Sequence, residues 1–233
     1  MVRIKCNGVA LGYDRKTVVE NLNFEIESGD FFCIVGDNGS GKTTLMKALL
    51  GLKKVSAGSI EFPDGSSGAR LGYLPQQAEE RRDFPATVEE VVLSGFVGSL
   101  GGRFFFSRSQ RKSARENMYR LGISELAKKP FAELSGGQRQ RALIARALCA
   151  ADDMILLDEP VSALDPVATE DLYEIICELN KNHGVTVIMI THDVGAVMKY
   201  ADKVLYVGDE PRFFRSAREY GESASYPSQK EAR

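Results

Sequence analysis

An apolar run that leads straight into a glycine-rich loop and then into a helical pattern constrains this fold most. The run is "FFCIV" at Phe31–Val35, and its continuous apolar character is typical of a strand covered on both faces. "GDNGSGKTT" follows at Gly36–Thr44 and fits the pattern G-x-x-x-x-G-K-[ST], and the helical pattern "KTTLMKALLG" comes next. In that order, backbone N–H groups and a helix N-terminus can surround a phosphate. The segment predicts a nucleotide-phosphate site in an α/β fold.

Two further apolar runs end at polar side chains. "MILL" at Met154–Leu157 precedes Asp158 and Glu159, and "VTVIMI" at Val185–Ile190 leads to His192. Because open α/β sheets bind ligands at the carboxyl ends of their parallel strands, we expect the three runs to outline one site. Two plainer interpretations stay open: Asp158 and Glu159 as a surface pair that opens a loop, and His192 as a structural cap.

These side chains have the chemistry of nucleotide hydrolysis. Lys42 can place a positive charge at the β- and γ-phosphates, and the Thr43 hydroxyl can bind Mg²⁺. Asp158 can hold the same cation directly or through water. Glu159 can accept a proton from an attacking water, and His192 can hydrogen-bond that water and the γ-phosphate. The sequence therefore predicts that the loop and the two strand ends share a hydrolytic site.

The chain changes character in its middle. Residues 78–150 show no strand pattern, so we expect a mostly helical segment inserted into an α/β core of residues 1–77 and 151–220. "RIKCNGVALGYD" and "ENLNFEIESGD", near the start, look like antiparallel strands that flank this core. The stretch 221–233 is polar and rich in Ser and Glu, and we expect it to be disordered.

Two helix starts follow from capping patterns. Thr87 and Glu90 in "TVEEVVLSG" fit a capping box, in which each residue satisfies a backbone N–H of the other. Asp165 and Pro166 fit the N-cap and the first helical position of an amphipathic helix in "DPVATEDLYEIICELNK".

The composition excludes several other classes of protein. The net charge of −2 and the pI of about 5.9 give no overall basic field for nucleic acid, and we expect Arg108, Arg111 and Lys112 to form a solvated helix face. The four cysteines are dispersed without metal-binding spacing, which indicates buried thiols in a reducing compartment. No apolar run approaches the roughly 20 residues that span a bilayer, and the N-terminus is too polar for a signal peptide. We therefore expect a cytosolic chain that meets a membrane only through a partner.

"LSGGQRQR" at Leu134–Arg141 is a second candidate anion site. It offers two glycines and a hydroxyl at the start of a helical pattern, where backbone N–H groups point outward. The glycine-rich loop at Gly36–Thr44 is already a more complete phosphate-binding site. The residues alone do not say why one chain carries both.

Six motifs occur in a recognisable order. They are "GDNGSGKTT", "LPQQ" at Leu74–Gln77, "LSGGQ", "MILLDEP", "SALD" at Ser162–Asp165 and "THD". Together they resemble the ATP-binding subunit of ABC transporters over nearly the whole chain, and "LSGGQ" separates this family from other P-loop proteins. The resemblance implies an α/β fold: a P-loop (RecA-like) ABC ATPase core with an antiparallel β flank and an inserted helical subdomain. It also implies ATP hydrolysis with Mg²⁺.

The resemblance explains why the chain has two candidate phosphate-binding sites. In this family two subunits sandwich two ATP molecules head to tail, so that the P-loop of one subunit and "LSGGQ" of the other hold the same ATP. The resemblance therefore implies that the ATP of the partner subunit is bound by Ser135, Gly136, Gly137 and Gln138. It also implies that the chain's own ATP is bound by Tyr13, Gly36, Asn38, Gly39, Ser40, Gly41, Lys42, Thr43 and Thr44.

Other assignments carry over one residue at a time. Tyr13 would stack on adenine, although it could also be an ordinary strand tyrosine. Gln76 would contact Mg²⁺ and the attacking water, and Asp165 would belong to a loop that crosses the dimer interface. Asp37 stands where the family commonly has proline, and Val161 where it commonly has threonine. We expect the Asp37 carboxylate to point away from the phosphates, because it adds a negative charge near them.

The transport system follows from the resemblance as well. A subunit-sized chain without a membrane span looks like the ATPase of an importer whose permease is a separate protein. "LGYLPQQ" followed by "DFPATVEEVVLSGFVG" is similar to ATPases of the zinc and manganese uptake group, and this stretch would form the permease-docking groove. Iron-siderophore and cobalamin ATPases have a similar sequence in this region, so those solutes stay open as alternatives.

The implied partners are a second copy of the chain or a second ATPase subunit, integral membrane permease subunits and an extracytoplasmic solute-binding protein. The chain would then lie at the cytoplasmic face of the cell membrane as a peripheral subunit. Nucleic acid is not among the expected partners. Two other classes compete: a soluble ABC ATPase that acts on nucleic acid or protein assemblies, and a non-catalytic regulatory cassette. The intact Glu159 and His192 argue against the second of these.

Overall fold

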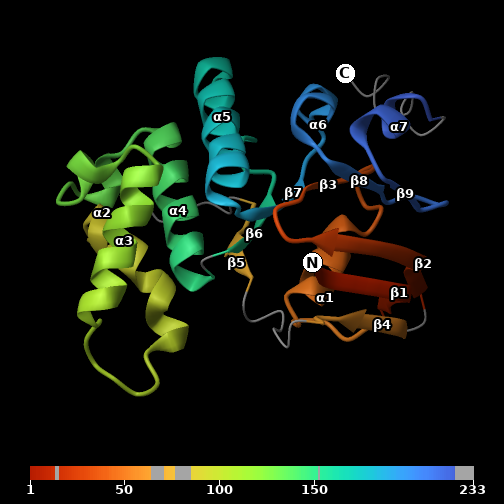
Figure 1. The fold of residues 1–233 in the computed structure, drawn as a ribbon, viewed down its shortest axis with the longest axis horizontal. Helices are drawn as coiled ribbons and strands as arrows, with labels where there is room; N and C mark the ends of the chain where they lie inside the picture. Colours follow the sequence, from red (N-terminus) through yellow and green to blue (C-terminus); the bar gives the residue numbers. More distant parts are fainter. Residues whose placement is uncertain (14–15, 64–70, 77–84, 152, 224–233) are drawn as a thin grey trace. The chain divides into compact units, whose positions relative to one another are not determined.

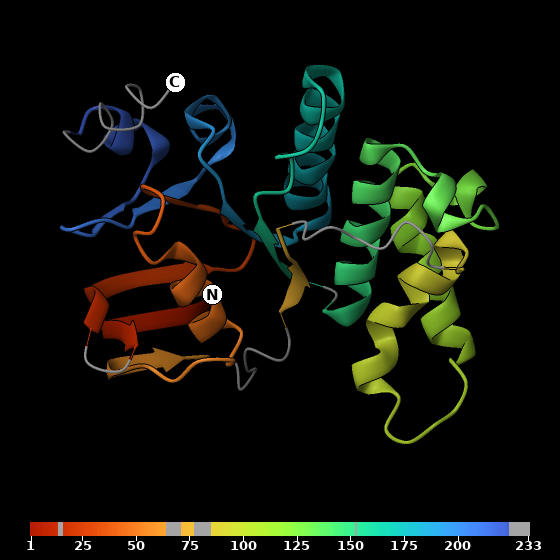
Figure 2. The ribbon, with the colours of Figure 1, turned by 180° about the vertical axis from the view of Figure 1, so that it is seen from behind.

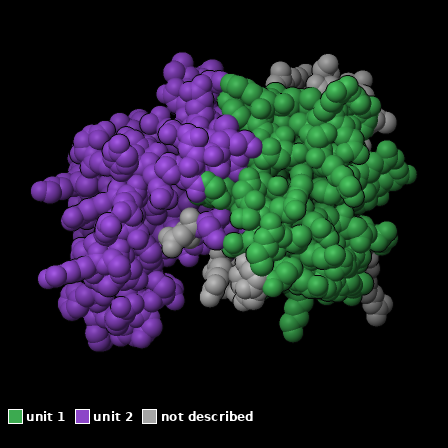
Figure 3. All heavy atoms as spheres, in the orientation of Figure 1, with its two compact units in different colours: residues 1–70, 184–233 green, residues 71–183 purple. Residues whose placement is uncertain are grey.

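The chain forms two compact units, residues 1–70 with 184–233 and residues 71–183, and we describe them one at a time (Figure 3). The structure is a computed structural model. It describes residues 1–13, 16–63, 71–76, 85–151 and 153–223.

Parallel strands form the centre of the first unit. β3 (Phe31–Val35) pairs in parallel with β7 (Thr186–Ile190) on one side and with β8 (Lys203–Tyr206) on the other. β9 (Arg212–Phe214) extends this sheet by antiparallel pairing with β8. All residues of β3 and β7 are buried, which is why their sequences read as uninterrupted apolar runs. Both of these strands were predicted, whereas β8 and β9 were not.

A three-stranded antiparallel sheet flanks this centre; the sequence predicted the first two of its strands but not the third. Its order is β2 (Lys16–Glu27), β1 (Val2–Tyr13) and β4 (Ala57–Glu61). Phe24 of β2 lies 5.4 Å from Phe32 of β3, ring centre to ring centre. Aromatic packing of this kind buries the inner face of the flank and joins it to the parallel strands.

The helices of the first unit begin where strands end. α1 (Lys42–Leu49) follows the glycine-rich loop and lies against the antiparallel flank (Figures 1 and 2). α6 (Val194–Tyr200) follows β7 and is capped by Asp193, whose Oδ1 accepts a hydrogen bond from the Ala196 N–H at 3.0 Å. α7 (Ala217–Gly221) runs into the start of the tail that was expected to be disordered, and most of that tail lies outside the described residues.

The second unit combines a short parallel pair of strands with helices. β5 (Gly72–Leu74) pairs in parallel with β6 (Met154–Asp158). The α-helices are α2 (Val88–Leu93), α3 (Arg108–Arg120), α4 (Gly136–Ala150) and α5 (Pro166–His183), and short 3₁₀ helices span Ser94–Ser99, Ser124–Leu126 and Phe131–Glu133. Within the described part of 78–150, the elements are helical apart from one isolated bridge between Thr87 and Pro130.

The predicted caps are present. Thr87 and Glu90 form both hydrogen bonds of a capping box at the start of α2. Asp165 Oδ1 accepts a hydrogen bond from the Ala168 N–H at 2.9 Å, and α5 starts at Pro166. The sequence did not predict a second capping box, between Ser107 and Gln110 of α3, nor a third at the start of α4.

Two expectations about side chains have mixed outcomes. Arg108, Arg111 and Lys112 are exposed on α3, as predicted for a solvated face. Three of the cysteines are buried, but Cys177 on α5 is only half-buried. The amphipathic helix explains this difference, because Cys177 follows the fully buried Ile176 and so lies at the margin of its apolar face.

Candidate nucleotide-binding site

The glycine-rich loop connects β3 to α1 in the first unit, and its backbone requires glycine at three places. Gly36, Gly39 and Gly41 have φ values of 147°, 82° and 103°, a region that side chains disfavour. A Cβ at Gly36 would lie 2.0 Å from the Val207 carbonyl oxygen, and one at Gly41 would lie 2.4 Å from Val19 Cγ2. The loop can therefore wind closely against its neighbours only with glycine at both ends.

Lys42 points back into this loop. Its Nζ donates hydrogen bonds to the carbonyl oxygens of Gly36 and Asp37, each at 2.7 Å, and its side chain is buried. Burying an ammonium group is costly unless negative charge or strong acceptors surround it. The loop therefore presents a fixed, partly desolvated positive charge, which suits a phosphate.

The other loop residues offer polar groups. Asn38 and Gly39 are exposed, and Thr43 is exposed in the first turn of α1 while Thr44 is buried. Ser40 Oγ is buried and has no hydrogen-bond partner among the described residues. A buried hydroxyl without a partner is unfavourable, and a phosphate oxygen or a water at the loop would satisfy it.

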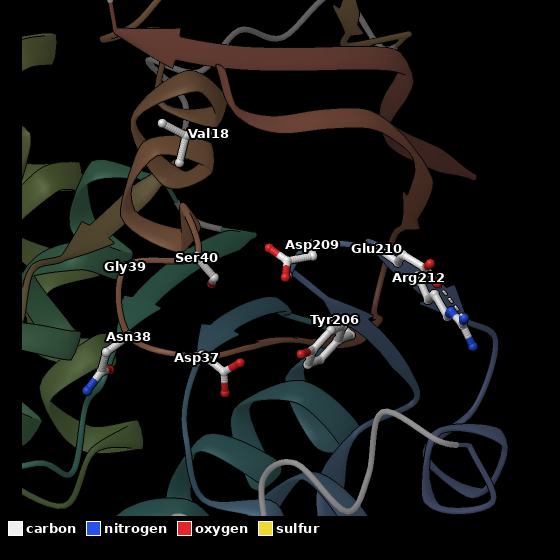
Figure 4. Close-up of a pocket in the computed structure, with 10 residues that line it drawn as sticks. Val18, Asp37, Asn38, Gly39, Ser40, Tyr206, Asp209, Glu210 and Arg212 are labelled. Carbon is white, nitrogen blue, oxygen red and sulfur yellow. Dashed lines mark hydrogen bonds and ion pairs between the residues drawn. The ribbon is translucent and has the colours of Figure 1, made fainter. Parts of the chain in front are cut away.

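A cavity of ≈ 550 Å³ opens beside the loop (Figure 4). Its lining consists of Val18, Asp37, Asn38, Gly39, Ser40, Tyr206, Gly208, Asp209, Glu210 and Arg212. The Asp37 carboxylate is turned toward Tyr206, which stands at the end of β8 (Figure 4). Burial raises the pKa of Tyr206, and the negative charges of Asp37 and Asp209 raise it further.

His192 and Tyr13 are the other predicted site residues of the first unit. His192 is exposed in the connection between β7 and α6. The cap of α6 is Asp193, so the alternative of His192 as the cap of that helix is wrong. Tyr13 is the last residue of β1 and pairs with Lys16; its side chain lies outside the described structure.

In the second unit, two predicted site residues meet at the end of β6. Gln76 Nε2 donates a hydrogen bond to Glu159 Oε2 at 2.8 Å. Glu159 has a positive φ of 48°, which costs a residue other than glycine about 1–2 kcal/mol and turns the chain sharply after the strand. Both residues were predicted to act on the same water, but their direct contact was not predicted.

Asp158, the last residue of β6, carries a carboxylate and is buried, with 5% of the residue's surface exposed. Burial raises the pKa of the neighbouring Tyr73 hydroxyl to about 12, and the charge of Asp158 contributes to that rise. The described residues contain no group of three His, Cys, Asp or Glu side chains that could hold a metal ion. A cation here would therefore need further oxygen ligands, such as hydroxyls, amides or phosphates, as Mg²⁺ commonly has.

The "LSGGQ" motif forms the start of α4. Ser135 Oγ accepts a hydrogen bond from the Gln138 N–H at 3.3 Å, and Gln138 Oε1 accepts one from the Ser135 N–H at 3.2 Å. The helix start lines a cavity of ≈ 380 Å³ together with Ala163, Leu164 and Asp165 of the "SALD" segment. The structure thus brings together two motifs that the resemblance had placed at one dimer interface.

Comparisons with known proteins identify the family of the chain. The family described as "ABC transporter" matches residues 19–162. The zinc uptake system ATP-binding protein ZurA of Listeria innocua serovar 6a is 34% identical over 223 residues, which cover 93% of this chain and 87% of the relative.

Two solved structures are similar over most of the chain. One is described as an inward-facing metal-chelate type ABC transporter; its TM-score is 0.86 at 29% identity, with 98% of this chain and 88% of that chain covered. The other is an ATP-binding cassette solved as a dimer with ADP and Pi; its TM-score is 0.72 at 26% identity, with 91% of this chain and 99% of that chain covered. The chain therefore belongs to the ATP-binding subunits of the ABC transporter family, and it is an ABC-type transport ATPase.

Proposed function

We propose that the loop Gly36–Thr44 binds the β- and γ-phosphates of ATP, with Lys42 as the charged partner. The observation that carries this proposal is the position of Lys42, whose ammonium group is buried and held 2.7 Å from two carbonyls of the loop. Tyr13, at the end of β1, is the candidate for stacking on adenine.

Mg²⁺ fits the remaining oxygen donors. We assign it to the Thr43 hydroxyl, the Asp158 carboxylate and the Gln76 side chain. Asp158 supports this assignment, because a buried carboxylate gains from a nearby cation that offsets its desolvation. When bound, the cation would neutralise part of the phosphate charge.

Glu159 is the candidate general base. Its carboxylate can accept the proton of a water that attacks the γ-phosphate, and the 2.8 Å hydrogen bond from Gln76 restricts its orientation. His192 would hydrogen-bond the γ-phosphate and the same water. The positive φ at Glu159 supports this role, since strained backbone conformations cluster at active sites.

Ser135, Gly136, Gly137 and Gln138 would bind the ATP held by a partner subunit. The N-terminus of the 15-residue helix α4 carries partial positive charge, and the capping box fixes its first turn. ATP would then bridge two subunits in a closed dimer and make only half of these contacts in an open one. Binding therefore shifts the population toward the closed dimer, and hydrolysis releases it.

This cycle would drive import through a separate membrane permease. None of the described helices is long and apolar enough to cross a bilayer. The start of α2 is a candidate wall of the docking groove: its capping box fixes the helix end, and Val88, Val91 and Val92 anchor it in the core. Phe84 and Pro85 would form the rim of the groove; Phe84 lies outside the described residues, and Pro85 is exposed. The chain would sit at the cytoplasmic face of the cell membrane, as a dimer with permease subunits and an extracytoplasmic solute-binding protein.

The proposed cargo is zinc or manganese. The name of ZurA, a zinc uptake protein, supports zinc of the two. A strain that lacks the gene should fail to grow when zinc or manganese is chelated. The wild-type gene and the control Lys47→Ala, which changes an exposed lysine of α1, should restore growth, whereas Lys42→Ala should not. Normal growth of the deletion strain without either metal would contradict the cargo, and restoration by Lys42→Ala would contradict the ATP site.

A further inference from the structure

Asp37 places a carboxylate inside a loop that otherwise suits phosphate. Its backbone carbonyl accepts a hydrogen bond from Lys42 at 2.7 Å, so its main chain is fixed on the inner side of the loop. Its side chain is exposed and is turned toward Tyr206 (Figure 4). The direction of this one side chain decides whether its charge opposes a bound phosphate.

Tyr206 is fixed relative to the loop by the sheet. It stands opposite Val35 in the parallel pairing of β8 with β3, and Val35 is the residue that precedes the loop. The next residue, Val207, donates its N–H to the Val35 carbonyl at 2.8 Å. The sheet therefore fixes the backbone of the tyrosine on the strand next to the loop, and its side chain starts beside Asp37.

The other donors of the cavity lining are the Asn38 amide, the Ser40 hydroxyl and the Arg212 guanidinium. Arg212 is the cationic side chain of its lining, and its guanidinium is paired with Glu210 at 2.8 Å. Asp209 also faces the cavity and adds negative charge. Burial, the charges of Asp37 and Asp209, and hydrogen bonding to Asp37 raise the pKa of Tyr206, so its hydroxyl stays protonated and can donate to a carboxylate.

We propose that Tyr206 is a positioning residue of the phosphate loop: its hydroxyl holds the Asp37 carboxylate on the outer side, away from the phosphates of ATP. The proposal rests on the function proposed above. It assigns a role to a pair that does not belong to the general loop motif, since Asp37 stands at one of its variable positions and Tyr206 lies outside it.

The test is a two-residue cycle measured as nucleotide affinity of the purified subunit, with MgATP as the ligand. Tyr206→Phe removes the hydroxyl and keeps the ring, so the Asp37 carboxylate is released. We expect affinity to fall roughly three- to tenfold, the size of a screened charge interaction near a protein surface, and to recover partly at high salt. In the Asp37→Asn background, the same Tyr206→Phe change should alter affinity less than about twofold. In ATPase assays of the permease complex, KM should rise while kcat stays unchanged.

Each alternative predicts a different pattern. Equal losses from Tyr206→Phe in both backgrounds would mean that the hydroxyl acts independently of the Asp37 carboxylate, and the proposal would be wrong. It would also be wrong if Tyr206→Phe bound MgATP as tightly as wild type. Lys42→Ala separates the two proposals: if it abolishes binding while the tyrosine change does nothing, the ATP site stands and only the role of Tyr206 fails. Normal binding by Lys42→Ala would overturn both.

Discussion

Glu159→Gln is expected to bind MgATP but to hydrolyse it very slowly. The substitution removes the proposed base and keeps the shape of the side chain, and the new amide oxygen can still accept the hydrogen bond that Gln76 now donates at 2.8 Å. The turn after β6 should therefore keep its geometry. Loss of a general base commonly costs about 10²- to 10⁴-fold in rate, which corresponds to roughly 3–5 kcal/mol of activation free energy.

The assay is steady-state ATP hydrolysis by the complex with its permease, together with the mass of the ATP-bound subunit in solution. Hydrolysis should fall by at least about a hundredfold, and the variant should accumulate as a dimer, because ATP bridges the subunits and is not removed. Glu174→Gln on the exposed side of α5 is the matched control and should behave as wild type. Near-wild-type turnover by Glu159→Gln would refute the assignment of Glu159 as the base.

Two other experiments test the partner contact and the helix cap. The first uses cross-linked dimers in which one subunit carries Ser135→Arg and the other carries Lys42→Ala. Both changes then damage the same composite site, so one ATP should bind normally and the other should be lost. Two intact sites, or none, would exclude a contact across the interface. Thr87→Ala should lower the free energy of unfolding by about 1 kcal/mol in denaturant titrations, and Thr87→Ser should restore most of it. Hydrogen bonding to Thr87 lowers the pKa of Glu90, so the share of the cap's stability that the Glu90 carboxylate supplies should be present above the ordinary glutamate pKa and be lost as pH falls through the lowered one. A cap effect that stayed constant down to pH 2 would contradict this linkage.

The sequence predicted best where local pattern and burial coincide. β3, β6 and β7 have fully buried residues, so their apolar runs marked them clearly. β8 and β5 were missed because they have only four and three residues, and β8 starts with the charged Lys203. Strands this short gain their stability from neighbours in the sheet, and that information is not local.

The candidate site shows the same division. The residue types and positions of the phosphate loop could be recognised from spacing alone. The capping box of Ser135 and Gln138 fits the pattern S-x-x-Q and could have been predicted from it. The bond between Gln76 and Glu159 joins residues 83 positions apart and depends on the positive φ at Glu159, so no local signal announces it.

Gly137→Ala separates a glycine kept for a ligand from one kept for the backbone. Unlike Gly36 at φ 147°, Gly137 has no positive φ, and a Cβ there would lie 3.4 Å from Ala168 Cβ, an ordinary contact. Alanine also favours helix by up to about 1 kcal/mol over glycine, so Gly137→Ala should fold with unchanged or higher stability.

If this helix start receives the ATP of a partner subunit, the added methyl group should still impede the close approach of phosphate. We therefore expect monomers that bind MgATP normally but form few ATP-bound dimers and hydrolyse little ATP. Gly36→Ala should instead lose nucleotide binding already in the monomer, since its Cβ would lie 2.0 Å from the Val207 carbonyl. Full ATPase activity of a well-folded Gly137→Ala would mean that no phosphate approaches this helix closely.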